Sequence, residues 1–213
     1  MKTIARLLLT FSLLLFITAS SVKIALNFKA LYYWDIEHLN IKSYTTLSKE
    51  EIRSTYDYLI NFINTDKTDE FRIPLLPSSK EAAIHFQEVK SLFIKLNYIL
   101  FSSAIVSAAG IYYMKKYRDF SPLKWCSIMI WLSFIVLSGT FYINFDKSFN
   151  FFHKVLFNND YWLFSPKTDP VINILPQEFF LHCAILILLL IVLWSAFLLI
   201  IFRKLNKDKR VSI

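Results

Sequence analysis

The chain has 213 residues, of which 55% are hydrophobic, and its formal net charge is +8. It contains 21 Phe, 11 Tyr and 5 Trp but only 2 Gly, and its mean hydropathy is +0.44. A soluble core of this size has no use for so many aromatic side chains, whereas a bilayer accepts them over its whole thickness. The composition therefore excludes an ordinary soluble domain and predicts a membrane protein.

Four apolar stretches are long enough to cross a membrane. About 20 helical residues span the roughly 30 Å of hydrocarbon, because each residue advances the helix by about 1.5 Å. The predicted spans cover approximately residues 7–27, 96–114, 125–145 and 179–202. We therefore expect an all-α integral membrane protein with four transmembrane helices, in which residues 1–213 form a single membrane domain.

The orientation follows from the basic residues near the span ends, because Lys and Arg are retained on the cytoplasmic side. The three short segments on one side of the membrane carry eleven basic and two acidic residues. We therefore place both termini in the cytoplasm and the two longer segments outside. The same placement accounts for the net charge, so we expect no nucleic-acid partner. The basic residues are Lys2, Arg6, Lys115, Lys116, Arg118, Lys124, Arg203, Lys204, Lys207, Lys209 and Arg210, and the acidic ones are Asp119 and Asp208.

The first outer segment, residues 28–95, is predicted to form a small, mostly helical extracytoplasmic cap. Ser48 and Glu51 make a capping-box pattern at the start of an amphipathic helix. A second such pattern, formed by Ser78 and Glu81, predicts another helix that runs without a break into the second span. The segment is therefore too structured to be a flexible tether.

The second outer segment, residues 146–178, is rich in aromatic residues. Between Asp146 and Trp162, six of the 17 residues are large aromatics, and a single histidine, His153, lies among them. This composition is typical of a short helix that lies in the membrane interface and is anchored by its aromatic side chains. His153 is therefore predicted to lie at the outer membrane surface.

Two histidines at membrane level carry the candidate chemistry. Histidine transfers protons near neutral pH because its unperturbed pKa is about 6.5. His85 lies in the first outer segment, and Glu88 lies on the same helical face three residues later, where it can reach the imidazole. His153 contributes a second imidazole from the other outer segment.

Other uses of these two histidines are weaker. A pair of haem ligands is expected to face one another inside the spans, and neither residue lies in a span. Soft metal ligands are absent and only one carboxylate is well placed, so we predict no metal site and no cofactor. The remaining alternative is that both histidines only pack at the interface.

The sequence around these histidines resembles the lipoprotein intramolecular transacylases (Lit), a family of bacterial integral membrane proteins. The resemblance rests on residues 81–93, on residues 149–162, and on Asp169 with the run 175–180. The length and the layout of four spans are similar as well. At the position of Glu88 the family more often has Asp, so the side chain is longer in this chain.

This resemblance implies an acyltransferase that acts on a diacylated bacterial lipoprotein. The N-terminal cysteine of that lipoprotein carries a diacylglyceryl thioether and a free α-amine. The sn-2 acyl chain moves to the amine, leaving a lyso-form lipoprotein, and no second lipid is consumed. The enzyme is then a monomeric, multi-pass protein of the bacterial cell membrane, surrounded by membrane lipid, with its active site at the outer leaflet.

On this reading His85 is the general base, Glu88 orients it, and His153 is the acid or the oxyanion donor, although the two histidine roles are exchangeable. Three further residues are expected to shape the substrate pocket: Asp160, Trp162 and Tyr58. The alternative function is that of a non-enzymatic membrane accessory protein that binds a partner through its outer cap. Transport is disfavoured because the spans carry almost no ionisable groups.

Overall fold

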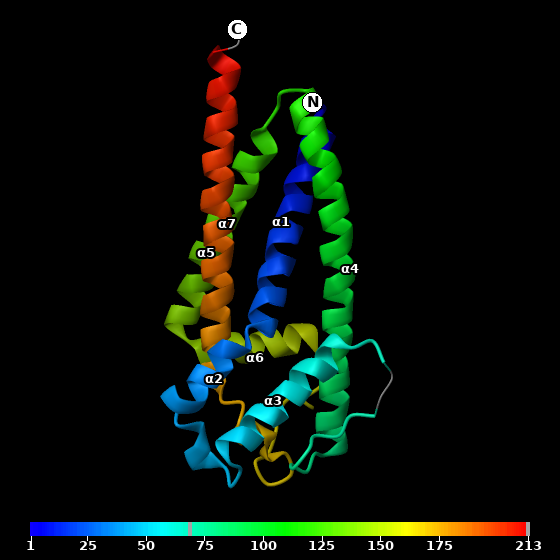
Figure 1. Ribbon diagram of the computed structural model, residues 1–213, viewed down its shortest axis with the longest axis vertical. Helices are drawn as coiled ribbons and strands as arrows, with labels where there is room; N and C mark the ends of the chain where they lie inside the picture. The colour runs from blue at the N-terminus through cyan, green and yellow to red at the C-terminus, as the bar shows by residue number, and fades with distance from the viewer. Residues whose placement is uncertain (68–69, 212–213) are drawn as a thin grey trace. The chain divides into compact units, whose positions relative to one another are not determined.

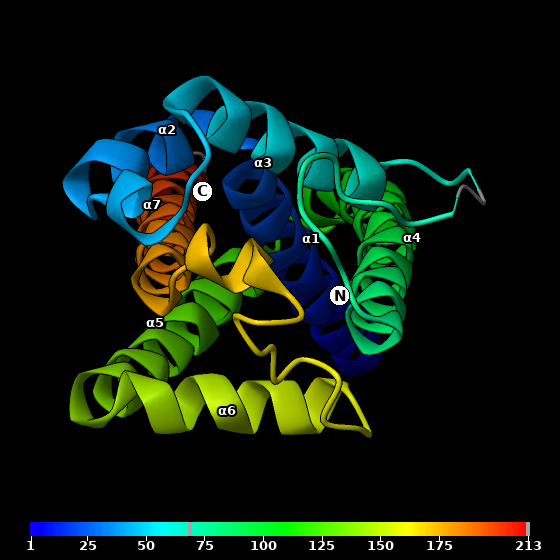
Figure 2. The ribbon, with the colours of Figure 1, turned by 90° about the horizontal axis from the view of Figure 1, so that it is seen from below.

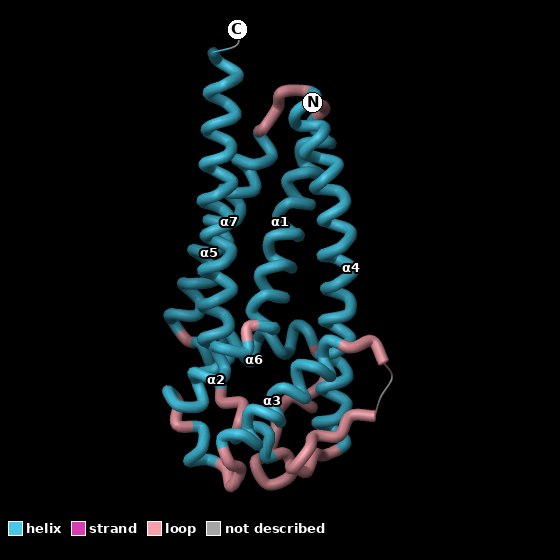
Figure 3. Tube along the Cα trace, viewed as in Figure 1, coloured by secondary structure: helices cyan, strands magenta, loops and turns pink. Residues whose placement is uncertain are grey.

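The computed structural model describes residues 1–67 and 70–211, and these residues form only helices and loops (Figure 3). The all-helical class predicted from the sequence is confirmed. The helices in chain order (Figure 1) are α1 (Thr3–Asn27), α2 (Lys29–His38), the short 3-10 helix η1 (Ile41–Tyr44), α3 (Lys49–Asn64), α4 (Lys80–Lys116), α5 (Ser121–Ile143), α6 (Phe145–Leu156), η2 (Pro170–Asn173) and α7 (Gln177–Val211).

The chain divides into two compact units. The span unit comprises Met1–Ile24, Leu96–Tyr142 and the described part of Ile185–Ile213, and the cap unit comprises Ala25–Lys95 and Ile143–Ala184. Four helices are long and apolar enough to cross a membrane, namely α1, α4, α5 and α7. The predicted four-span architecture is therefore confirmed. The third span, α5, ends at Ile143 rather than at residue 145, because Asn144 is the N-cap of the helix that follows.

Serine side chains join the helices of the span unit. The Ser12 hydroxyl lies 3.0 Å from both the Ser103 carbonyl oxygen and the Ser107 hydroxyl. Ser127 and Ser195 each donate to the other's carbonyl oxygen, at 3.2 and 3.3 Å. Small residues allow helices to approach closely. A serine hydroxyl within the membrane is stabilised when it donates a hydrogen bond to an acceptor on a neighbouring helix. These serines therefore tie α1 to α4 and α5 to α7.

A salt bridge joins the start of α1 to the loop between α4 and α5 in the span unit. Arg6 Nε donates to Asp119 Oδ2 at 2.6 Å. The predicted cytoplasmic location of this end of the unit stays a prediction. The side chains of Asp208, Lys209 and Arg210, which belong to the predicted C-terminal charge cluster, lie outside the described residues.

The cap unit has an aromatic and aliphatic core of its own. Tyr32 of α2 stacks on Tyr56 of α3 with ring centroids 3.8 Å apart, and its hydroxyl donates to the Ile174 carbonyl at 2.6 Å. Ser48 is the N-cap of helix α3, and both bonds of the predicted capping box between Ser48 and Glu51 are present. The buried core residues are Tyr32, Ile36, Ile41, Leu47, Ile52, Tyr56, Leu59, Ile60, Phe62, Ile63, Phe71, Ile73, Phe86, Val171, Ile174, Leu175 and Phe179.

The start of α4 differs from the sequence prediction by one residue. Ser79 is the N-cap, and its hydroxyl accepts the Ala82 N–H at 3.0 Å. The backbone N–H of Ser79 donates to Asp169 Oδ1 at 2.6 Å, whereas the predicted box paired the N–H of Ser78 with Glu81. A carboxylate from the second outer segment thus replaces the expected capping-box partner. This contact fixes the first turn of the helix that carries His85.

Helix α6 is amphipathic, as predicted for the second outer segment. It begins where the Asn144 side chain accepts the Lys147 N–H at 2.8 Å. Figure 2 shows this helix in yellow-green with the loop that follows it. Its exposed apolar side chains include Phe151, Phe152, Val155 and Leu156. An apolar face without protein cover is typical of a helix that lies in a membrane interface.

Replacing Asp169 by Ala is expected to lower the stability of the protein. The side chain is only 4% exposed, and it accepts hydrogen bonds from the Ser79 N–H and from the Thr168 hydroxyl. Hydrogen bonds to a charged group contribute about 1.5–3 kcal/mol, so the melting temperature should fall by several degrees. Thermal unfolding in detergent measures this change. The exposed Asp66 is the matched control, and equal melting temperatures of D169A and D66A would contradict the prediction.

Candidate active site

His85 is buried in the second turn of α4, within the cap unit and before the predicted span that starts at residue 96. Its side chain is 7% exposed. Its ring meets those of Phe157 and Phe164 edge to face, with centroids 4.7 and 5.5 Å away. Burial, with a smaller contribution from the nearby His153, lowers the pKa of His85 to about 4. The ring is therefore neutral at neutral pH.

His153 lies in the last turn of α6, and its tautomer follows from a hydrogen bond. Nδ1 lies 2.8 Å from the Phe149 carbonyl oxygen. A carbonyl only accepts, so Nδ1 carries the proton and Nε2 keeps its lone pair. The ring stacks on Trp162 with centroids 4.7 Å apart. Burial lowers the pKa of His153, and the bond to Phe149 opposes that shift.

The two imidazoles meet although they come from different outer segments. Their ring centroids are 6.0 Å apart, with 37° between the ring planes. Phe157 packs against both imidazoles, and the centroid of its ring lies 4.7 Å from that of His85 and 5.8 Å from that of His153. The structure thus places a free imidazole lone pair and a second neutral imidazole together among aromatic rings. Such a pair can take a proton from one group and donate a hydrogen bond to another.

Glu88 does not hold the His85 ring, contrary to the sequence prediction. Its Oε1 accepts a hydrogen bond from the Asn159 amide at 2.8 Å. Among the described residues, Glu88 Oε2 and His85 Nδ1 are both buried without a hydrogen-bond partner. The spacing of three residues places the two side chains on one face. The Glu88 carboxylate nevertheless accepts its hydrogen bond from the Asn159 amide of the second outer segment.

Asn159 is a residue of this site that the sequence did not predict. Its side-chain oxygen accepts the Tyr161 N–H at 3.0 Å, and its backbone carbonyl accepts the Trp162 indole N–H at 3.0 Å. Asparagine often bonds to the backbone two residues later in a turn. The Asn-Asn-Asp run at 158–160 therefore offered a signal for the turn, but none for the bond to Glu88.

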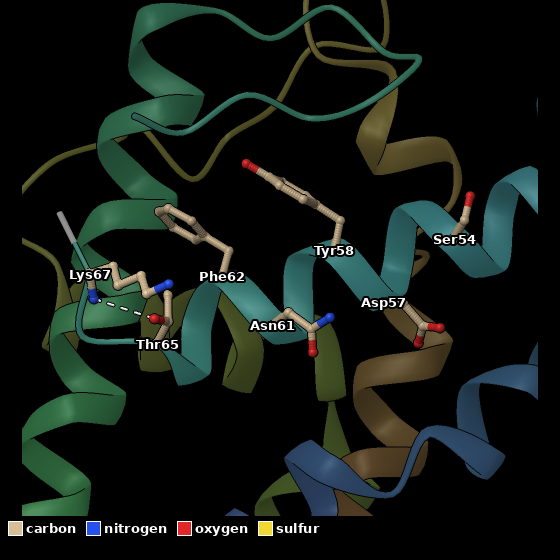
Figure 4. Close-up of a pocket in the computed structure, with 7 residues that line it drawn as sticks. All are labelled: Ser54, Asp57, Tyr58, Asn61, Phe62, Thr65 and Lys67. Atoms are coloured by element: carbon tan, nitrogen blue, oxygen red, sulfur yellow. Dashed lines mark hydrogen bonds between the residues drawn. The ribbon is translucent and has the colours of Figure 1, made fainter. Parts of the chain in front are cut away.

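Of the three residues predicted to shape the pocket, only Trp162 contacts the imidazoles. Its side chain is 8% exposed and stacks on His153. Asp160 is exposed. Tyr58 points from α3 beside Phe62 over a shallow groove (Figure 4). Its hydroxyl accepts the Arg72 N–H at 3.0 Å, and none of its recorded contacts is with a histidine.

Another histidine pair lies elsewhere in the cap unit. His182 Nδ1 lies 2.7 Å from Asp35 Oδ1, and the His38 ring is 5.9 Å from that of His182. Asp35 is fully buried, and this burial raises its pKa, while the bond to His182 opposes the shift. Within the described residues, no group of three His, Cys, Asp or Glu side chains has the geometry of a metal site. The bond between Asp35 and His182 joins α2 to the first turns of α7.

Comparisons with known proteins agree with this architecture. A family model described as lipoprotein intramolecular transacylase Lit matches residues 7–180. A solved structure of the membrane integral lipoprotein intramolecular transacylase Lit from Bacillus cereus is 36% identical, with 98% of this chain and 97% of that chain covered and a TM-score of 0.94. A second structure of that protein, with an H85R mutation, is 36% identical, with 99% and 94% covered and a TM-score of 0.87.

A relative from Aquifex aeolicus (strain VF5), described as an uncharacterized protein, is 29% identical over 142 residues. The match spans 62% of this chain and 62% of that relative. This similarity carries no information about activity.

His85 is expected to make folding stability depend on pH. Its pKa is about 4 in the folded protein, against about 6.5 in an unfolded chain, so the unfolded state binds the proton more readily. The stabilising contribution is complete above about pH 6.5 and is lost as the pH falls towards about 4. His85→Phe removes the titrating group and should lose less stability between about pH 7 and about pH 5.

Melting temperatures of the wild type and H85F in detergent at both pH values measure the difference. Its size should be on the order of 1–2 kcal/mol over this interval. Parallel loss of stability in the two proteins would contradict the prediction.

Proposed function

Because the chain belongs to the lipoprotein intramolecular transacylase family, we propose that it moves the sn-2 acyl chain of a diacylglyceryl lipoprotein to the α-amine of the N-terminal cysteine. The product is an N-acylated lyso-form lipoprotein. The observation that carries this proposal is the pair of neutral imidazoles, His85 buried and His153 half-buried, whose ring centroids lie 6.0 Å apart. One chain supplies both imidazoles and one substrate supplies both reacting groups, so a monomer suffices.

The reaction balances without a co-reactant. The amine nitrogen attacks the ester carbonyl carbon, an N–C bond forms, and the bond from that carbon to the sn-2 oxygen breaks. The proton lost by the amine ends on the sn-2 oxygen. An α-amine has a reference pKa of about 7.7–8.0, so at neutral pH most of it carries an additional proton, which it must release to solvent before it can attack. The proton that the base accepts and returns to the sn-2 oxygen is the second one, which the nitrogen loses as the N–C bond forms.

His153 is the better placed base in this proposal, which exchanges the roles first assigned to the two histidines. Its Nδ1–H donates to the Phe149 carbonyl, so Nε2 is free to accept the proton of the amine. The same hydrogen bond stabilises the imidazolium that forms and supports the basicity of the ring. The proton then passes from His153 to the departing sn-2 oxygen.

His85 serves as the hydrogen-bond donor to the tetrahedral oxyanion. A pKa of about 4 makes it a poor proton acceptor, but its neutral ring keeps one N–H at neutral pH. A donor held in a water-poor site stabilises developing negative charge more than the same donor in water. The aromatic rings of Phe157 and Phe164 around it supply that environment.

The surroundings of the pair suit an intramolecular transfer. Trp162 and Phe157 shield the imidazoles, which limits hydrolysis of the ester by water. The exposed apolar face of α6 allows this helix to lie among lipids, where the acyl chains of the substrate are found. In the predicted orientation this interface belongs to the outer leaflet. Holding both reacting groups of one molecule together replaces a bimolecular encounter.

The test is mass spectrometry of the N-terminal lipopeptide of a lipoprotein, taken from cells that lack other N-acylating enzymes. Expression of this protein should convert the diacylglyceryl peptide into an isobaric species with one acyl chain on the amine. Unchanged lipopeptide would contradict the proposal and favour an accessory protein.

His85→Ala and His153→Ala are each expected to reduce conversion by about 100-fold or more, since general acid–base groups contribute about 10²–10⁴ in rate. Expression and membrane insertion should stay normal, because both substitutions leave the span unit untouched. The exposed His38, replaced by Ala, is the control. Loss of the folded protein rather than of its activity would instead indicate that the histidines serve packing.

A further inference from the structure

We propose that Asn159 is a positioning residue that sets the geometry of the two imidazoles by linking Glu88 to Trp162. This inference rests on the proposed function and adds a residue to its machinery. Asn159 itself touches neither histidine in any recorded contact. It acts through Trp162, which stacks on His153, and through Glu88, which lies on the helix that carries His85.

Within the described part of the chain, Asn159 makes three hydrogen bonds, and each uses a different group. Its amide N–H donates to Glu88 Oε1 at 2.8 Å. Its side-chain oxygen accepts the Tyr161 N–H, and its backbone carbonyl accepts the Trp162 indole N–H, both at 3.0 Å. Asn159 therefore makes two hydrogen bonds within the loop after α6 and a third that joins this loop to α4.

The bond to Trp162 orients the ring that lies on His153. Trp162 is 8% exposed and stacks on His153 with 28° between the ring planes. The indole N–H has one direction, so its bond to the Asn159 carbonyl fixes how the ring turns in its own plane. His153 is thereby held by Trp162 on one face and by the Phe149 carbonyl at Nδ1.

The bond to Glu88 reaches the helix that carries His85. Glu88 lies three residues after His85 in α4, and a continuous helix keeps the relative position of their backbones constant. Its carboxylate accepts from an amide, which makes this a charge-assisted hydrogen bond. Through Asn159, the loop that orients His153 is therefore anchored to the helix that orients His85.

If Asn159 only formed the turn at Tyr161, its replacement by Asp should have little effect. The bond from the Tyr161 N–H to its side-chain oxygen forms a turn that Asp makes equally well. Only the amide N–H to Glu88 requires Asn. Asn159→Asp thus keeps the turn, removes the link between the two elements, and sets two carboxylates against each other.

The experiment compares kcat and KM of purified proteins in detergent with a synthetic diacylated lipopeptide. N159D is expected to lower kcat about tenfold or more while KM changes little, because the loss of a charge-assisted bond misplaces the acid–base pair rather than the acyl chains. N159A should lower kcat by a smaller factor, because it removes the link without adding repulsion. Asn158→Asp makes the same chemical change at the exposed neighbouring position and serves as the matched control.

The decisive variant reverses the polarity of the link. In N159D/E88Q, the amide introduced at position 88 donates to the carboxylate at position 159, and the turn at Tyr161 is kept. Most of the kcat lost in N159D should return, whereas a residue with only a local role gives no reason for recovery. Melting temperatures of all variants verify that they are folded.

Each outcome has one meaning. A kcat of N159D equal to that of N158D, or an impaired N159D that E88Q does not rescue, overturns the positioning role. If N159D does not fold, a wild-type kcat in N159A overturns it. Absence of acyl transfer in the wild-type protein contradicts the proposed function itself, which separates that failure from a failure of the inference.

Discussion

The bilayer imposes the constraint on which the rest of this structure depends. Hydrocarbon offers no hydrogen-bond partner to a polypeptide backbone, so a span must satisfy its own N–H and C=O groups as a helix. In the span unit, even hydroxyls bond to neighbouring helices, as Ser12 and Ser127 do. The two histidine pairs, His85 with His153 and His38 with His182, lie in the cap unit. Helix α4 takes part in both units, with His85 in its polar first turns and apolar residues beyond residue 95.

Burial among aromatic rings determines how the two imidazoles can act. It removes water and so lowers the pKa of both, which keeps them neutral at neutral pH but weakens them as bases. The Phe149 carbonyl offsets this effect at His153 alone. Two residues of one type thus become chemically different through a single backbone hydrogen bond. The same burial couples protonation to stability, so folding depends on pH.

Two polar contacts hold the second outer segment on α4. Asp169 accepts from the backbone of Ser79 at the start of the helix, and Asn159 donates to Glu88 further along it. Ser79, the N-cap, and Glu88 are nine residues apart, which is about 13.5 Å along a helix axis. Contacts at two separated points resist rotation as well as translation of the segment. The loop that carries Trp162 runs between them, beside His153.

Short-range patterns in the sequence were sufficient for the four spans, for α3 with its capping box at Ser48 and Glu51, and for α6, because hydropathy and caps depend on residues a few positions apart. They did not predict α2. They also singled out His85 and His153, which the tertiary structure brings together. The partner of Glu88 is 71 residues away in the chain, and that of Ser79 is 90 residues away. No local pattern encodes such distances, so spacing alone assigned Glu88 to His85 and placed the second cap at Ser78. The interpretation that followed from the family resemblance grouped Tyr58 and Asp160 with the site. Only the packing of the second outer segment against α4 decided those contacts, because a side chain bonds to whichever donor or acceptor the fold brings within reach.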